Sequence, residues 1–154
     1  MPVELKDIMQ VDPKIIKFIK KQHVLSLSVI LPDDNLWACN TFYVFDEKLM
    51  NLYLLSELKT DHAKAMLKHP QVAGTINIIP KTVAQIQGIQ FQATATLLQK
   101  EQAVHAYRLY YQAFPFARVI KAPIWSLQLQ RIKMTSNLLG FGRKIHWLKG
   151  ENNF

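Results

Sequence analysis

The fold is decided by a stretch in the first half of the chain, which reads HVLSLSVIL (23–31), PDDN (32–35), LWACNTFYVF (36–45), DEK (46–48) and NLYLLS (51–56). Alternating apolar and polar positions, rich in β-branched and aromatic residues, predict strands over 23–31, 36–45 and 51–56. The two short segments between them carry turn-forming residues. Three strands joined by short turns predict an antiparallel meander.

The rest of the chain adds helices and further strands around this meander. Capping residues and helical spacing predict helices over 12–22, 60–68 and 101–113. Strand patterns follow over 72–79, 83–98, 124–135 and 138–148, and Gly88 in the second of these predicts a bulge or bend. Six or seven strands and about three helices, without strand–helix alternation, predict a mainly β fold, an antiparallel barrel with peripheral helices.

The composition is that of one globular domain. The chain has 154 residues, of which 49% are hydrophobic and 19% charged. We expect a single domain over 1–154, with an N-terminal arm over 1–10 and a frayed tail over 150–154. The single cysteine, Cys39, excludes an internal disulfide and fits the reducing cytoplasm. No apolar run approaches a membrane span and the first ten residues do not form a signal peptide, so no membrane partner is expected.

Motifs for most enzyme chemistries are missing from the sequence. It contains no nucleophile elbow, Walker loop, dinucleotide-binding glycine motif or zinc-protease motif. The five histidines, at 23, 62, 69, 105 and 146, are not spaced as zinc ligands, so we predict no metal site and identify no catalytic residue. Nineteen Lys and Arg against eleven Asp and Glu give a net charge of +8, which favours an anionic ligand.

The junction between the third strand and the second helix predicts an anion site. The strand ends at Ser56, and the helix opens at Thr60 with unpaired backbone N–H groups and the positive end of its dipole. Lys59, His62 and Lys64 belong to the same junction as the two hydroxyls. Together these groups form a cradle for a terminal phosphate, and the alternative is a capped helix on the surface.

The aromatic strand over 36–45 has two different faces. It places Asn40, Phe42 and Val44 on one side and residues 41, 43 and 45 on the other. One row should face the core. The other row should face outwards, onto a flat ligand or a second copy of the chain.

These elements, in this order, resemble the pyridoxamine 5′-phosphate oxidase-like family of flavin-binding split β-barrels. The matching segments are Ser56 with TDHA (60–63), HPQVAG (69–74), QIQGIQFQA (85–93), and Tyr107 with YQAFP (111–115). The small bacterial YhbP-type branch is similar also in KQHV (21–24), CNTFYVFD (39–46), PKTVA (80–84), APIW (122–125) and LLGFGRK (138–144). The resemblance covers about residues 10–149 and implies a homodimer with FMN sites at the subunit interface.

The resemblance also implies roles for particular residues. Ser56 and Thr60 match hydroxyl contacts to the FMN phosphate, and Gln90 matches a glutamine that reaches the flavin. The oxidases carry Arg-Lys where this chain has Asp61-His62, so an acid and a titratable ring replace two permanent cations. We expect lysines to compensate. The predicted cofactor-binding residues are Asn40, Phe42, Ser56, Lys59, Thr60, His62, Lys64 and Gln90.

The expected function is that of an FMN-binding oxidoreductase whose substrate the sequence does not name. The substrate motif of the oxidases, Arg-x-His, is not reproduced by RKIH (143–146), so pyridoxamine phosphate oxidation is not expected. A first alternative is a non-enzymatic flavin or haem binder for storage or sensing, with His23, His62 or His146 as the axial ligand. A nucleic-acid-binding barrel ranks last. If His62 faces the phosphate, FMN affinity should rise as pH falls from about 8 to 6.

Overall fold

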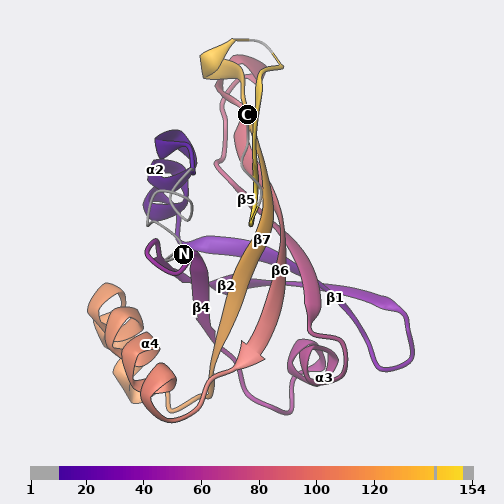
Figure 1. Ribbon diagram of the computed structural model, residues 1–154, viewed down its shortest axis with the longest axis vertical. Helices are drawn as coiled ribbons and strands as arrows, with labels where there is room; N and C mark the ends of the chain where they lie inside the picture. Colours follow the sequence, from indigo (N-terminus) through magenta and orange to yellow (C-terminus); the bar gives the residue numbers. More distant parts are fainter. Residues whose placement is uncertain (1–10, 141, 151–154) are drawn as a thin grey trace, which may run out of the picture.

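The computed structural model describes residues 11–140 and 142–150, which form a curled antiparallel sheet with helices at its periphery (Figure 1). The helices are α2 (Pro13–Lys21), α3 (Asp61–Lys68) and α4 (Lys100–Ala113), with short 3-10 turns η1 (Val83–Gln85), η2 (Pro115–Val119) and η3 (Asn137–Leu139). The strands are β1 (Val24–Ile30), β2 (Leu36–Phe42), β3 (Val44–Asp46), β4 (Asn51–Leu55), β5 (Gln71–Asn77), β6 (Gln87–Leu97), β7 (Ile124–Ser136) and β8 (Lys144–Leu148). The predicted arm over 1–10 and the tail beyond residue 150 lie outside the described residues.

The two ends of the sheet meet at a single residue. The strand order is β2-β1-β5-β6-β7-β4-β3, all neighbours are antiparallel, and β8 adds to β7. The first and last strands of this order, β2 and β3, are separated in the chain only by Tyr43. Its backbone N–H donates to His23 O at 2.9 Å, and its buried hydroxyl donates to Ile19 O at 2.7 Å. At this corner the chain passes from β2, which lies beside β1, to β3, which lies beside β4. The sheet thereby curls into a barrel.

The predicted fold class, a mainly β split barrel with peripheral helices, is confirmed. The described sheet has eight strands because the segment predicted as one strand over 36–45 is divided at Tyr43. The expected bulge is misplaced: Gly88 pairs regularly with Asn77 and Thr135, and the register shifts between Gln92 and Ala93 instead. The strand predicted from residue 83 begins at 87, because 83–85 form η1.

Local sequence explains the first helix and what it covers. The Asp12 side chain accepts a hydrogen bond from Lys14 N at 2.8 Å, and Pro13 occupies the first turn, where its missing N–H costs nothing. Two lysines in the last turn stabilise the helix by their attraction to the negative end of its dipole. The buried side of α2 consists of Ile15, Phe18 and Ile19, so the helix closes one part of the main core.

The apolar residues form two clusters. The larger one fills the inside of the barrel, where Trp125 is the largest fully buried side chain. The smaller one lies between α4 and the outer face of β4 and β7, and includes Tyr53, Ala106, Tyr110 and Ile124. Figure 1 shows α4 standing beside the sheet, and residues 124–127 are consequently buried on both faces of β7. None of the described helices is long and apolar enough to cross a membrane.

Candidate functional site

The first candidate site lies where β4 leads into α3. Ser56 is buried, its backbone N–H donates to Pro123 O at 3.0 Å, and its carbonyl accepts from Trp125 Nε1 at 3.2 Å. Thr60 is the N-cap of α3: its hydroxyl oxygen accepts from Ala63 N at 3.2 Å. The start of β7 therefore fixes the position of Ser56, while the helix fixes that of Thr60.

His62 joins these two hydroxyls in a cluster. Its Nε2 lies 2.5 Å from Ser56 Oγ and 3.4 Å from Thr60 Oγ1, and the two hydroxyl oxygens are 3.1 Å apart. Partial burial lowers the pKa of His62, and the weaker opposing effect of the Asp61 carboxylate does not reverse this. The imidazole is therefore neutral at neutral pH. The structure brings together three of the predicted phosphate-binding residues, in a hydroxyl cluster made of Ser56, Thr60 and His62.

The hydroxyl cluster is hydrogen-bonded within itself. Thr60 donates its proton to Glu57 O at 2.9 Å, and the Ser56 hydroxyl is shared between Thr60 and His62. A phosphate would have to replace the bond between Ser56 and His62, which would free one hydroxyl and one ring nitrogen for it. Lys59 and Lys64 are exposed, and no hydrogen bond of the described residues uses their ammonium groups. Both cations are available to an incoming anion beside the positive end of α3.

A row of polar side chains crosses the outer face of the sheet. It runs through Asn40, Ser26, Thr75, Gln90, Lys133 and His146, each paired with the next. Residues directly opposite each other in paired strands point to the same side of the sheet. Within the row, Ser26 Oγ donates to Asn40 Oδ1 at 2.9 Å. Three strand spacings separate Asn40 from Gln90, or roughly 14 Å, so the two predicted residues share a face without touching.

This outer face is polar and positively charged at one end. The row beside the first one consists of Ala38, Ser28, Ala73, Gln92, Arg131 and Leu148. Arg131 and Lys133 border a hollow of about 270 Å³, and Gln90 and Gln92 line it with them. Neither row contains a carboxylate. The face therefore offers hydrogen bonds and positive charge to a flat anionic ligand.

An aromatic corner, formed by His23, Phe42 and Phe114, adjoins this face at β2. Phe42 is 56% exposed, and its ring meets that of Phe114 edge to face at a centroid distance of 5.7 Å. The exposed His23 ring contacts Phe114 in the same manner at 6.0 Å. Tyr43 is buried, so of the two rows predicted for 36–45 it is the row of Asn40 and Phe42 that faces outwards.

A second cluster, beneath α4, was missed from the sequence. The Asp46 carboxylate is only 7% exposed, and its Oδ2 accepts from the Tyr53 hydroxyl at 2.9 Å and from His105 Nε2 at 2.9 Å. Arg108 Nη2 donates to His105 Nδ1 at 3.0 Å, which assigns the ring proton to Nε2. We call these four residues the carboxylate cluster.

The charge of this cluster follows from its hydrogen bonds. Burial alone would raise the pKa of Asp46, but the bonds from His105 and Tyr53 outweigh it and the pKa is lowered. Burial, together with the neighbouring Asp46 carboxylate, raises the pKa of Tyr53 to about 12. At neutral pH the cluster therefore holds an ionised carboxylate between a phenol and an imidazole.

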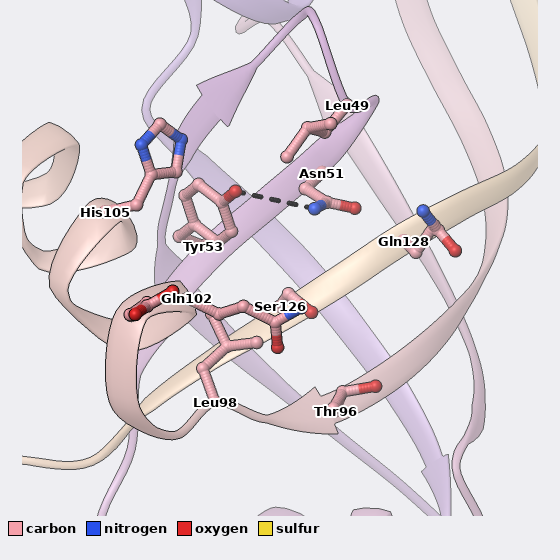
Figure 2. A pocket seen from close by; sticks show the side chains of 10 residues that line it. Leu49, Asn51, Tyr53, Thr96, Leu98, Gln102, His105, Ser126 and Gln128 are labelled. Atoms are coloured by element: carbon pink, nitrogen blue, oxygen red, sulfur yellow. Dashed lines mark hydrogen bonds between the residues drawn. The ribbon is translucent and has the colours of Figure 1, made fainter.

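A pocket of about 480 Å³ opens beside the carboxylate cluster, and Figure 2 shows Tyr53 and His105 on one side of it. Asn51 donates to the Tyr53 hydroxyl at 3.5 Å across the pocket wall. The wall is otherwise formed by Leu49, Thr96, Leu98, Glu101, Gln102, Ser126 and Gln128. Asp46 and His105 are 59 residues apart in the chain, so no local motif predicts this cluster. In the sequence Asp46 belongs to the turn predicted over 46–48, and nothing there indicates its burial.

The fold and the outer face define the class of protein, a split β-barrel with a polar, positively charged sheet face. Within that class, the chain belongs to the UPF0306 protein family. It is 46% identical over 136 residues to a UPF0306 protein of Serratia proteamaculans, covering 88% of this chain and 94% of that one. It is 45% identical over 138 residues to one from Yersinia enterocolitica, covering 90% and 93%. A comparison with models of protein families gave no match.

Solved structures with the same fold include haem-binding and flavin-binding proteins. A haem-binding protein of Mycobacterium smegmatis superposes with a TM-score of 0.74 at 15% identity over 90% of this chain, which spans 59% of that protein. The haem storage protein HutZ of Vibrio cholerae gives 0.65 at 15% identity, covering 92% and 96%. An FAD-binding protein of Mesorhizobium loti gives 0.65 at 9% identity, covering 80% and 94%. At these identities the likeness establishes the shared fold.

Proposed function

We propose that the protein binds FMN, with the phosphate at the hydroxyl cluster and the ring on the outer sheet face, and that it acts as an oxidoreductase. The observation that carries this proposal is the convergence of Ser56, Thr60 and His62 at the start of α3. A solved flavin-binding protein with the same fold supports it. The proposal includes membership of the YhbP-type branch, which the sequence markers support.

The described residues fit the two halves of FMN. The Ser56 hydroxyl, a neutral imidazole and a helix N-terminus capped by Thr60 suit a phosphate, and Lys59 and Lys64 supply the charge that Asp61 opposes. The polar row through Gln90 supplies hydrogen bonds for the flat ring. When bound, the flavin supplies the redox chemistry, while the protein binds and orients the reactants.

The proposal includes a homodimer in which a second copy covers the outer face. Phe42 and the aromatic corner expose apolar surface beside the polar rows, and a partner would bury it. We expect a two-fold interface of more than about 2,000 Å² in total, the size of obligate dimers. Sedimentation equilibrium at micromolar concentration should give twice the chain mass, and a monomer would contradict the dimer.

Comparing FMN with riboflavin, which lacks the phosphate, isolates the phosphate site. We expect Lys64→Ala to weaken FMN binding by more than about tenfold and riboflavin binding very little, because a charged hydrogen bond contributes about 1.5–3 kcal/mol. Lys68→Ala is the matched control, since Lys68 lies in the last turn of the same helix and bonds Pro32 O. Equal losses for both flavins would remove Lys64 from the site.

Haem is the second candidate, and the aromatic corner favours it. The exposed His23 ring stands next to Phe114, which contacts Phe42, so an imidazole and apolar rings are available to a flat iron porphyrin. A Soret band after addition of haemin, lost in His23→Ala, would favour haem over FMN. Salt-sensitive binding of single-stranded DNA without any chromophore would favour the nucleic-acid alternative.

A further inference from the structure

We propose that a groove between α2 and the end of the β6–β7 pair where β6 begins and β7 ends binds a single-chain amphiphile with an anionic head, such as a fatty acid. In Figure 1, α2 stands beside the upper part of the long β6–β7 pair. The groove encloses about 650 Å³, which is within the range of small-molecule sites. It is separate in its residues from the hydroxyl cluster and the outer face, so this inference does not depend on FMN binding.

The floor and walls of the groove are largely apolar. Phe18 comes from α2, Ile78 and Ile79 follow β5, and Met134 lies on β7. Ile79 is 96% exposed and Leu138, at the far end, is 63% exposed. Apolar side chains left in water at the edge of a concave surface are typical of a binding groove. An alkyl chain lying there would bury them at about 25 cal/mol per Å².

The rim of the groove is positively charged. Lys14, Lys17 and Lys21 line it, and their spacing along α2 places them on one side of the helix. The neighbouring Lys20 instead pairs with Glu47 at 3.2 Å, outside the groove. Of the described residues that line the groove, none is acidic. The rim therefore selects an anion, and the apolar floor selects a chain attached to it.

A buried hydroxyl provides an independent sign of a ligand. Ser136 lines the groove and is 1% exposed, and its Oγ has no hydrogen-bond partner among the described residues. A buried hydroxyl without a partner costs free energy, so such groups are rare unless something binds them. Lysine stems are long and flexible, which lets their ammonium groups reach a head group held at Ser136. We assign Ser136 as the hydrogen-bond donor to the carboxylate.

Calorimetric titration of the full chain with decanoate, below its micelle concentration, tests the proposal. Decan-1-ol and decyltrimethylammonium keep the chain but change the head. We expect decanoate to bind at least about tenfold more tightly than either. Equal affinities for the three compounds, or no binding of decanoate, would overturn the proposal.

Variants of one helix separate the groove from general charge attraction. The double variant Lys17→Gln/Lys21→Gln should weaken decanoate by about tenfold, as the loss of charged contacts implies. Lys20 lies on the same helix but outside the groove, so Lys20→Gln should leave decanoate binding unchanged. If Lys20→Gln weakens binding as much per charge removed, the attraction is not local and the groove is not the site.

Ser136→Ala distinguishes a ligand contact from a structural role. Removing an unpaired buried hydroxyl should leave the denaturant midpoint unchanged or raise it, while decanoate binding falls several-fold. Unchanged decanoate affinity in this variant would contradict the assignment. Co-sedimentation with anionic phospholipid vesicles, without binding of monomeric decanoate, would identify a membrane surface as the partner and overturn the proposal.

Discussion

His62 and His105 are both partly buried histidines held by hydrogen bonds to other side chains, but their partners differ in charge. His62 contacts the hydroxyls of Ser56 and Thr60, and burial lowers its pKa. His105 donates to the ionised, buried carboxylate of Asp46. The hydroxyl cluster holds no buried charge, whereas the carboxylate cluster is built around one.

Because of this difference, a ligand can replace hydrogen bonds of the hydroxyl cluster but not those of the carboxylate cluster. A neutral hydrogen bond contributes about 1 kcal/mol net, so an arriving phosphate can replace the bond between Ser56 and His62 at small cost. Opening the carboxylate cluster would leave a buried charge unpaired, which is far more costly. The hydroxyl cluster is therefore the one that we propose for ligand binding, and the carboxylate cluster attaches α4 to the barrel.

The largest expected effect follows from removing the buried charge. Asp46→Ala leaves the Tyr53 hydroxyl and the His105 N–H without their partner beneath α4, and should lower the free energy of unfolding by about 3 kcal/mol. Denaturant unfolding at pH 7 measures this. Glu47→Ala is the control: its side chain is 47% exposed and pairs with Lys20 at 3.2 Å, so a change below about 1 kcal/mol is expected. Similar losses in both variants would contradict the special role of Asp46.

A smaller effect is expected in the hydroxyl cluster. Ser56→Ala removes one buried hydroxyl shared between Thr60 and His62 and should lower the free energy of unfolding by about 1 kcal/mol. Ser28→Ala, on the exposed outer face, should change it by only a few tenths of a kcal/mol. A loss in Ser56→Ala as large as that in Asp46→Ala would show that the two clusters do not differ as we describe.

The clusters should also lose stability in different pH ranges. The pKa of His62 is lowered in the folded state, so its contribution is present above about pH 6.5 and is lost as pH falls through the folded pKa. The pKa of Asp46 is also lowered, and its contribution is present above about pH 3.9 and lost on further acidification. Unfolding measured from pH 8 downwards should show that His62→Gln removes the first decline, whereas Asp46→Asn flattens the second. A first decline that persists in His62→Gln would contradict this assignment.

Sequence reasoning found the hydroxyl cluster because its members are neighbours in the chain. Ser56, Thr60 and His62 fall within one strand–helix junction, where capping patterns and the resemblance both apply. Asp46 and His105 meet only because α4 docks on the outside of β4, and no spacing rule predicts such docking. The same holds for Asn40 and Gln90: alternation assigned Asn40 to one of two faces without deciding which is outer, and Gln90 came from the resemblance alone. Their shared row depends on the strand order and register.

The strand boundaries, too, depend on contacts between residues distant in the chain, which the sequence pattern does not predict. Apolar alternation continues through Tyr43, so the sequence predicted one strand where the chain turns between two parts of the sheet. The hydrogen bonds that fix this corner run from Tyr43 to the carbonyl oxygens of His23 and Ile19, which are distant in sequence. Gly88 was a reasonable position for a bulge, yet the extra residue lies opposite the Gln92–Ala93 step on β7.

Lowering of the pKa of His62 also modifies the expected pH dependence of FMN binding. The ring of the free protein is neutral at pH 8 to 7 and adds no cation there, so affinity rises on acidification only if the bound phosphate raises the pKa of His62, and the rise begins at the pKa of the complex. The phosphate gains its own second proton near pH 6. We therefore expect a weak maximum, smaller than the effects above, in FMN titrations of the wild type across this range, and no rise on acidification in His62→Gln.

The central claim is that the hydroxyl cluster, and not the carboxylate cluster, holds an FMN phosphate. The most direct test measures FMN and riboflavin affinities side by side at pH 7 in the wild type, Ser56→Ala and His105→Gln. The wild type and His105→Gln should both prefer FMN by at least about tenfold, and Ser56→Ala should lose most of that preference. Equal affinity for the two flavins in the wild type, or a preference unchanged by Ser56→Ala, would contradict the account.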